Sequence, residues 1–237
     1  MNQSSLFAVV PAAGIGKRMN SEIPKQYLKL AGEEILWRSI RRLRETGLLK
    51  DVVVAVSEDD EFIHTLPSDL KSFCQIVIGG ESRNESVFAA LKKLKKRIKD
   101  HDFVLVHDAV RPCVRVSDIA QLVKQAKDSD LGSILGVPIT DTMKFTDTEN
   151  NILRTVDRKN MWRALTPQLF KFDKLYESIS FTIEQNIQVT DEAQAMEICG
   201  HSMRMIHGSP DNIKVTYSED LAIAEYFLEM QKKVSRR

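Results

Sequence analysis

The segment from Pro11 to Lys25 combines a turn of small residues with several positive charges. Its glycines and alanines leave little side chain between the backbone and a ligand, so the amides of residues 11–16 can approach a polyphosphate closely. Lys17 and Arg18 follow at once, and Lys25 comes directly after a proline. A small-residue turn followed by fixed positive charge is expected of a site that binds a nucleoside triphosphate.

The spacing in this turn excludes two familiar phosphate-binding loops. Gly14-Ile15-Gly16 lacks the third glycine of the dinucleotide fingerprint, and no Gly-Lys-Ser/Thr triplet ends the loop as in the Walker motif. By itself, the turn is also what an ordinary connection from a strand to a helix contains. The addition of Arg18 and of Pro24-Lys25-Gln26-Tyr27 is what favours nucleotide chemistry.

An acidic residue lies at the end of a later apolar segment. Asp108 follows the strand-like residues 102–107, and Arg111 comes three positions later. A carboxylate at a strand end serves a metal–triphosphate complex or a sugar hydroxyl. The alternative is a structural ion pair between Asp108 and Arg111. We interpret His107 as a packing residue rather than a catalyst, because no Ser or Cys nucleophile stands beside it.

A second polar loop begins with Gly79-Gly80 and leads into a predicted helix. It could present backbone amides and the hydroxyl of Ser86 to the edge of a base. The alternative reading is that Ser82 or Asn84 in this loop simply caps the helix.

These residues must be positioned by an alternation of apolar strands and amphipathic helices. Strands are predicted at residues 6–10, 51–56, 75–78, 102–107 and 133–137, and helices at 35–43, 58–66, 86–98, 116–127, 172–183, 191–198 and 219–230. The alternation predicts an α/β fold with a mostly parallel sheet flanked by helices. Ligands of such sheets bind beyond the carboxyl ends of the strands, where the loops at 11–18, 79–86 and 108–111 would meet.

Residues 138–160 depart from this alternation. Two strand-like runs, 139–145 and 152–158, flank a polar tip at 146–151, which predicts a β-hairpin arm inserted in a single domain of residues 1–237. An isolated hairpin is only marginally stable in water. We therefore expect the arm to pack on a second subunit in a homodimer.

Composition limits the classes of partner. The chain has 237 residues, 43% of them hydrophobic, with 34 Lys and Arg against 33 Asp and Glu. This balance predicts no general attraction to nucleic acid or membrane, and the basic run at 92–99 is interpreted as the solvated face of a helix. The scattered Cys74, Cys113 and Cys199 show no metal spacing and indicate reduced thiols in a cytoplasmic protein.

The turn, Arg18 and the Pro24-Lys25 pair resemble the signature of the sugar-phosphate nucleotidyltransferases. More narrowly, the chain from about Ala8 to Ala224 resembles the 2-C-methyl-D-erythritol 4-phosphate cytidylyltransferase family. The segments that carry the resemblance are AAGIGKRM at 12–19, PKQY at 24–27, GGESR at 79–83, HDAVRP at 107–112, DTMK at 141–144, TVDR at 155–158, ALTPQ at 164–168, TDEA at 190–193 and DNIKVT at 211–216. One departure is Glu81, where relatives often carry Asp.

The resemblance implies a Rossmann-like sheet with a β-arm that forms a homodimer. It also implies transfer of a cytidylyl group from CTP to a polyol phosphate in the non-mevalonate isoprenoid pathway, with release of pyrophosphate. The cofactor implied is Mg²⁺, carried by the triphosphate with Asp108 nearby, and no protein ligand of the metal is assigned. Neither nucleic acid nor a membrane is an implied partner.

The resemblance further assigns roles to individual residues. The implied catalytic residues are Arg18, Lys25, Arg158 and Lys214. The implied nucleotide-binding residues are Ala12, Ala13, Gly14, Gly16, Gly80, Glu81, Ser86 and Asp108. The implied acceptor-binding residues are Asp108, Arg111, Thr142, Arg158, Thr166, Thr190 and Lys214, of which Thr142, Arg158 and Thr166 are expected from the partner's side of a dimer.

Two other functions are consistent with parts of the sequence. The ribitol 5-phosphate cytidylyltransferases share the triphosphate half, although the DTMK, TVDR and TDEA segments favour the methylerythritol family. A non-catalytic nucleotide-binding regulator is the second alternative. The joint presence of Arg18, Lys25, Arg158 and Lys214 argues against that alternative.

Overall fold

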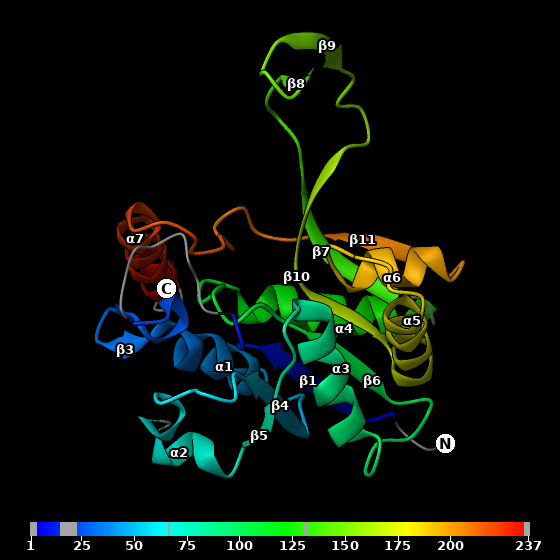
Figure 1. Ribbon diagram of the computed structural model, residues 1–237. Helices are drawn as coiled ribbons and strands as arrows, with labels where there is room; N and C mark the ends of the chain where they lie inside the picture. The colour runs from blue at the N-terminus through cyan, green and yellow to red at the C-terminus, as the bar shows by residue number, and fades with distance from the viewer. Residues whose placement is uncertain (1–3, 15–22, 66, 130–131, 235–237) are drawn as a thin grey trace.

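A seven-stranded sheet, in the order β11-β7-β10-β6-β1-β4-β5, forms the centre of the molecule (Figure 1). The computed structural model describes residues 4–14, 23–65, 67–129 and 132–234. Neighbouring strands pair in parallel except at β10, which runs antiparallel to both β6 and β7. The strands are β1 (Leu6–Pro11), β4 (Asp51–Val56), β5 (Cys74–Ile78), β6 (Phe103–Val106), β7 (Gly132–Pro138), β10 (Trp162–Lys171) and β11 (Met203–His207). The predicted mostly parallel α/β sheet is confirmed.

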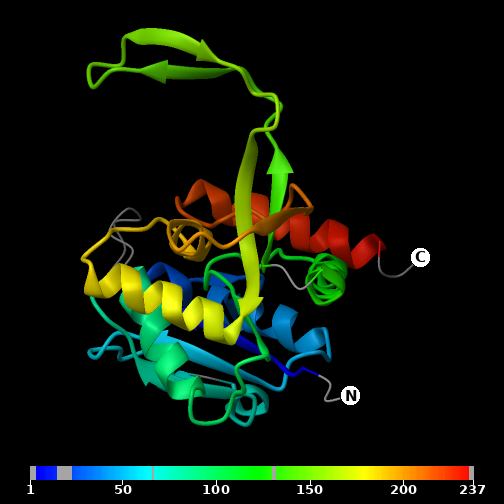
Figure 2. The same ribbon diagram turned by 90° about the vertical axis from the view of Figure 1, so that its right-hand side faces the viewer.

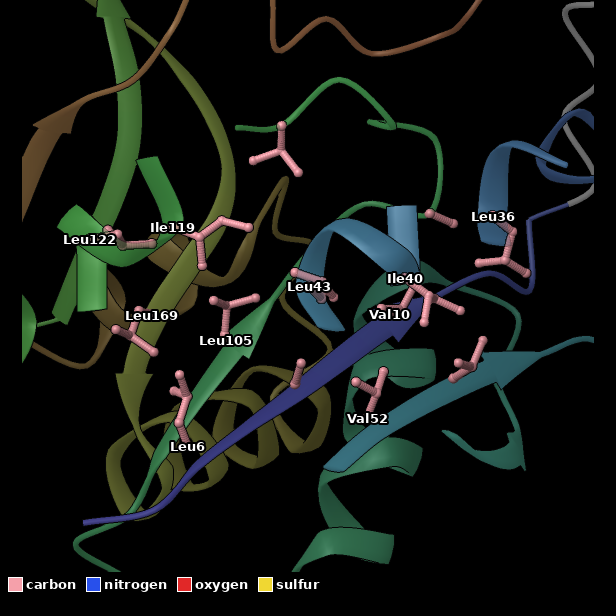
Figure 3. Close-up of a cluster of buried hydrophobic side chains, with 14 of the residues drawn as sticks. Leu6, Val10, Leu36, Ile40, Leu43, Val52, Leu105, Ile119, Leu122 and Leu169 are labelled. Carbon is pink, nitrogen blue, oxygen red and sulfur yellow. The ribbon is translucent and has the colours of Figure 1, made fainter. Parts of the chain in front are cut away.

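The sheet is buried on both faces. Alternate residues of each strand point to opposite sides, and apolar side chains on both sides are covered by helices. In β1, Leu6 and Val10 join one apolar cluster while Phe7 and Val9 join the other. Figure 3 shows the first cluster, in which α1 (Ile35–Glu45) and α4 (Val116–Ser129) contribute side chains such as Ile40 and Ile119. The second face is covered by α3 (Arg83–Leu94), α5 (Phe172–Glu184) and α6 (Glu192–Ile198).

The remaining elements are short or peripheral. The C-terminal helix α7 (Glu219–Val234) packs on Leu30, Ile35 and Val110 in a third apolar cluster. The other elements are η2 (Lys25–Tyr27), β2 (Lys29–Leu30), β3 (Glu33–Glu34), η3 (Ile63–Thr65) and α2 (Ser68–Lys71). None of the helices within the described ranges is both long and apolar enough to cross a membrane.

The predicted helix at residues 58–66 is wrong. The Asp60 carboxylate accepts hydrogen bonds from the backbone amides of Phe62 and Ile63, each at 3.0 Å, and this local pattern competes with a helix. Among residues 58–65, the part of this range that the structure describes, the η3 turn is the only helical element, and the short α2 follows Pro67. The predicted strands do not include β11, although Met203 and Met205 alternate with Arg204 in it.

The segment between β7 and β10 leaves the body of the molecule as a hairpin. Strands β8 (Met143–Thr146) and β9 (Ile152–Val156) pair antiparallel with each other and join no other strand of the described chain. Figures 1 and 2 show the hairpin projecting far from the central sheet. Phe145, Ile152 and Leu153 are 52%, 65% and 60% exposed on it. The arm therefore carries apolar side chains that its own chain leaves uncovered.

Candidate active site

The site forms where the carboxyl ends of β1 and β6 meet the first half of β10. Because β10 is antiparallel to β6, the pairing of Gln168 with Val106 brings Thr166 opposite Asp108, just beyond the end of β6. The backbone N–H of Asp108 donates to Thr166 Oγ1 at 3.0 Å. The register of β10 is irregular between Ala164 and Gln168, a stretch that contains the cis peptide bond before Pro167.

This register corrects one expectation. Thr166 belongs to the site of its own chain, so the expectation that it comes from the partner's side of a dimer is wrong. The physical reason is that the chain has already returned from the arm to the central sheet at Trp162, four residues earlier. Thr166 is buried there, at 4% exposure.

A first pocket, of about 160 Å³, lies between the small-residue turn after β1 and the turn before α3. Gly80 is required in this wall, because a Cβ atom at that position would overlap the side chain of Glu85. The predicted residues that line the pocket are Ala12, Ala13, Gly14, Lys25, Gly80, Glu81, Ser86, Asp108 and Lys214.

Ser82 and Ser86 shape the turn before α3. Ser82 is the N-cap of the helix in a capping box with Glu85, so the predicted capping role is confirmed for Ser82. Ser86 is buried, accepts from the Gly80 amide at 3.2 Å and donates to the Ser82 carbonyl at 3.0 Å. Its hydroxyl therefore holds Gly80 and Ser82 in the geometry that forms the pocket wall.

A second pocket, of about 180 Å³, adjoins the first. It contains five of the predicted acceptor residues, namely Asp108, Arg111, Thr166, Thr190 and Lys214. Arg83, Asp108 and Lys214 line both pockets. A ligand in one pocket would thus lie next to a ligand in the other, and both would lie beside these charged side chains.

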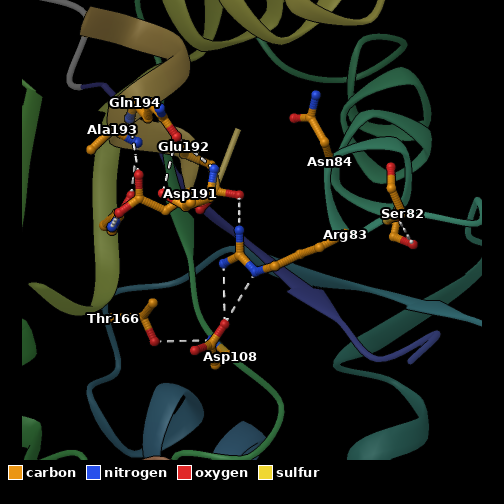
Figure 4. A network of polar contacts seen from close by, with 12 residues as sticks. Ser82, Arg83, Asn84, Asp108, Thr166, Asp191, Glu192, Ala193 and Gln194 are labelled. Atoms are coloured by element: carbon orange, nitrogen blue, oxygen red, sulfur yellow. Dashed lines mark hydrogen bonds and ion pairs between the residues drawn. The ribbon is translucent and has the colours of Figure 1, made fainter. Parts of the chain in front are cut away.

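Asp108 is the centre of an ion cluster, of which Figure 4 shows the contact with Arg83. Its Oδ1 accepts from Arg83 Nη2 at 3.1 Å, while its Oδ2 lies 3.1 Å from Arg111 Nε and 3.2 Å from Lys214 Nζ. Burial by itself would raise the pKa of Asp108, but the charges of Arg83, Lys214 and Arg111 outweigh burial and hold this pKa well below its usual range. The predicted Asp108–Arg111 ion pair is present, as part of a larger network.

His107 is buried beneath this cluster and is neutral. Thr166 Oγ1 accepts from the Asp108 amide, so its hydroxyl hydrogen can be donated to His107 Nδ1, 3.0 Å away. The opposite ring nitrogen then carries the proton and donates to the Arg111 carbonyl at 3.1 Å. Burial lowers the pKa of His107 to about 4. The ring therefore links Thr166 to the Arg111 backbone, in agreement with its predicted packing role.

Several supporting residues were not singled out from the sequence. Gln168 donates to Asp191 at 2.8 Å and accepts from the Ala193 amide at 3.0 Å, which fixes the start of α6 beside Thr190. Asn212 donates to the Thr166 carbonyl at 2.8 Å. Arg83 and Glu192 were also missed. All of these residues lie within the segments GGESR, ALTPQ, TDEA and DNIKVT, so those segments contained a usable signal.

The remaining predicted residues lie elsewhere. Thr142 and Arg158 are exposed in the arm segment and line neither of the two pockets of their own chain. The Arg158 guanidinium donates to the Thr140 carbonyl. Gly16 and Arg18 lie outside the described residues.

The site does not fit a divalent cation held directly by protein ligands. Within the described ranges, no three His, Cys, Asp or Glu side chains are grouped so that they could hold a metal. Both oxygens of Asp108 are already engaged by Arg83, Arg111 and Lys214, and three positive charges around one carboxylate oppose the binding of another cation.

Comparison with known proteins gives a consistent result. The family model "IspD: 2-C-methyl-D-erythritol 4-phosphate cytidylyltransferase" matches residues 6–230. Relatives named 2-C-methyl-D-erythritol 4-phosphate cytidylyltransferase include those of Photobacterium profundum, 44% identical over 96% of this chain and 98% of the relative, and of Vibrio vulnificus, 44% identical over 98% of each. The crystal structure of the Francisella tularensis protein of that name aligns with a TM-score of 0.83 at 35% identity, over 94% of this chain and all of that one.

Proposed function

Because the chain belongs to the 2-C-methyl-D-erythritol 4-phosphate cytidylyltransferase family, we propose that it transfers the cytidylyl group of CTP to 2-C-methyl-D-erythritol 4-phosphate. The products are 4-diphosphocytidyl-2-C-methyl-D-erythritol and pyrophosphate. The reaction is a step in the non-mevalonate synthesis of isoprenoid precursors.

The observation that carries this proposal is the meeting of two pockets at Arg83, Asp108 and Lys214. The pocket with the small-residue turn and Lys25 would take the nucleotide. The pocket with Arg111 and Lys214 would take the acceptor phosphate. A phosphate oxygen of the acceptor would then face the α-phosphorus of CTP where the two pockets meet, which is the geometry that a direct transfer requires.

The reaction needs no covalent enzyme intermediate. An acceptor phosphate oxygen forms a bond to the α-phosphorus, and the bond from that phosphorus to the bridging oxygen of pyrophosphate breaks. The protein must bring two mutually repelling anions together and neutralise the charge of the transition state. Lys25 and Arg18 would do so at the triphosphate, and Lys214 and Arg111 at the acceptor.

Mg²⁺ is proposed to arrive on the triphosphate rather than on a protein carboxylate. When bound there, the ion would reduce the charge that the attacking oxygen must approach. Asp108 is better suited to keep Arg111 and Lys214 aligned than to coordinate the ion, because both of its oxygens already have cationic partners.

The arm supports a homodimer. Its exposed Phe145, Ile152 and Leu153 would be covered by a second copy of the chain, as the predicted marginal stability of a lone hairpin requires. In such a dimer Thr142 and Arg158 could reach the acceptor pocket of the neighbouring subunit. We place the enzyme in the cytoplasm, where its free Cys74, Cys113 and Cys199 would stay reduced.

Pyrophosphate release by the purified full-length protein tests this function. The protein is incubated with Mg²⁺ and CTP, and with 2-C-methyl-D-erythritol 4-phosphate or ribitol 5-phosphate as acceptor. We expect release with the methylerythritol phosphate, and more with CTP than with UTP or ATP. Preference for ribitol 5-phosphate would assign the alternative acceptor. Nucleotide binding without release from either acceptor would support the regulator.

A further inference from the structure

Arg83 joins three elements of the site through one guanidinium (Figure 4). It is the first residue of α3, where the Ser82 capping box fixes the backbone. Its Nε and Nη2 lie 3.3 and 3.1 Å from Oδ1 of Asp108, at the end of β6. Its Nη1 donates to Oε1 of Glu192, the first residue of α6. A planar fork is suited to this double recognition, which a lysine could not reproduce.

The two oxygens of Asp108 have different partners. Oδ1 is bound by Arg83, whereas Oδ2 is bound by Arg111 and Lys214, the two cations proposed to hold the acceptor phosphate. When those cations turn toward a phosphate, Asp108 keeps a counter-charge only through Arg83. Without Arg83, the carboxylate would repel the acceptor phosphate and compete with it for Lys214.

Glu192 is an unusual residue to find buried at this position. It is 1% exposed, and its Oε2 has no hydrogen-bond partner among the residues that the structure describes. Burial raises the pKa of Glu192, and Arg83 offsets only part of that effect. A buried carboxylate with one unsatisfied oxygen is weak evidence for a contribution to stability. Its contact with Arg83 is the interaction that explains its presence.

We propose that Arg83 and Glu192 are a positioning pair, which holds Asp108 so that Arg111 and Lys214 are available to the acceptor phosphate. This inference rests on the proposed function. Glu192 keeps the Arg83 guanidinium directed toward Asp108, and Arg83 in turn binds Oδ1 of Asp108. Neither residue needs to touch the reacting atoms.

The first test is Glu192→Gln, which keeps the size of the side chain and an oxygen acceptor for Arg83 but removes the charge. We expect KM for 2-C-methyl-D-erythritol 4-phosphate to rise about tenfold, because a neutral amide holds the Arg83 guanidinium less firmly than a carboxylate does. KM for CTP should change by less than about twofold, because Glu192 is not among the described residues that line the first pocket. The matched control is Glu197→Gln, an exposed residue of the same helix, which should leave both KM values unchanged.

The second test separates positioning from folding. Arg83→Gln alone would leave Glu192 buried without its counter-charge, so the double variant Arg83→Gln/Glu192→Gln is used, because it pairs two neutral amides. We expect the double variant to melt close to the wild type while its acceptor KM remains at least tenfold raised, since Asp108 still lacks Arg83.

A folded double variant with wild-type acceptor KM would overturn the proposal. A raised acceptor KM in the double variant with a wild-type value in Glu192→Gln would remove Glu192 from the pair. Equal increases of the KM values for CTP and acceptor would show general disruption of the wall and would also overturn it. The wild-type assay is the separate check on function, because failure of the wild type to release pyrophosphate would count against the proposed reaction itself.

Discussion

Asp108 lies in the body of the molecule, which is formed by the central sheet and its helices, and Arg158 lies in the arm. The two residues differ in how many of their contacts come from their own chain. Asp108 is 6% exposed and bound by Arg83, Arg111 and Lys214. Arg158 is exposed, and the carbonyl of Thr140 on the same arm is its partner. The body thus forms the ion cluster around Asp108 within one chain. The arm presents charged and apolar side chains that its own chain leaves exposed.

The largest expected effect concerns Asp108 and the ion cluster around it. Asp108→Asn leaves three cations around a neutral amide, and breaking a buried ion network by removing one partner costs about 3–5 kcal/mol of unfolding free energy. Asp157→Asn removes a charge of the same kind from the exposed arm and should change stability by less than about 0.5 kcal/mol. Urea unfolding followed by circular dichroism measures both. Similar losses in the two variants would contradict the comparison.

The second effect is a pH dependence that originates in the body. His107 has a pKa of about 4 in the folded protein against 6.5 unfolded, so between these values the unfolded chain binds a proton that the folded chain does not. The free energy of unfolding should therefore fall as the pH drops from about 6.5 to 4, by up to about 3 kcal/mol, and this contribution is constant above pH 7.

Glu192 and Asp108 also make the free energy of unfolding depend on pH, and their contributions must be separated from that of His107. Glu192 acts with the opposite sign, because its raised pKa gives stability that is lost as the pH rises. The low pKa of Asp108 gives stability that is lost only below about pH 4. The measurement is thus the difference in slope between the wild type and His107→Gln, by urea unfolding at several pH values. Parallel curves would show that His107 is not a buried neutral ring.

The sequence was sufficient to predict the two regions but insufficient to predict their contacts. The β1 turn, the Asp108 strand end and the hairpin all follow from local patterns of apolar, small and polar residues. The contacts around Asp108 depend on the register of β10 against β6, which brings Thr166 to Asp108 over a separation of 58 positions, and on the position of α6, where Glu192 meets Arg83 over a separation of 109 positions. Such long-range pairing leaves no local pattern, so the segments GGESR and TDEA contain Arg83 and Glu192 but do not indicate that the two residues meet. The same limit explains why Thr166 was assigned to the partner's side.

The third effect compares one cation from each region. Lys25→Ala in the body and Arg158→Ala on the arm should each lower kcat/KM about a hundredfold, or about 3 kcal/mol, if each makes a charge-assisted contact to a phosphate in the transition state. Neither should unfold the protein. Lys159→Ala, an exposed neighbour of Arg158, is the control and should retain wild-type activity. Near wild-type turnover of Arg158→Ala would remove Arg158 from the catalytic residues.

The smallest expected effect is a heterodimer activity about twofold below that of the wild type. It distinguishes a site shared between two chains from a site within one chain. Lys25 lines the nucleotide pocket of its own chain, whereas Arg158 lines neither pocket of its own chain. If Arg158 acts on the neighbouring subunit, a heterodimer of Lys25→Ala and Arg158→Ala chains contains one site with both lesions and one site with none. Each heterodimer should then have about half of the wild-type activity, as the symmetry of a dimer requires.

The opposite geometry gives a different result in the same mixture. If each chain used its own Arg158, every site of the heterodimer would carry one lesion, and activity would stay at the level of the inactive parents. Subunit exchange must be shown first by native mass spectrometry of chains that carry different tags. With exchange established, recovery of activity would mean that the arm completes the neighbour's site. Absence of recovery would mean that Arg158 acts within its own chain or not at all.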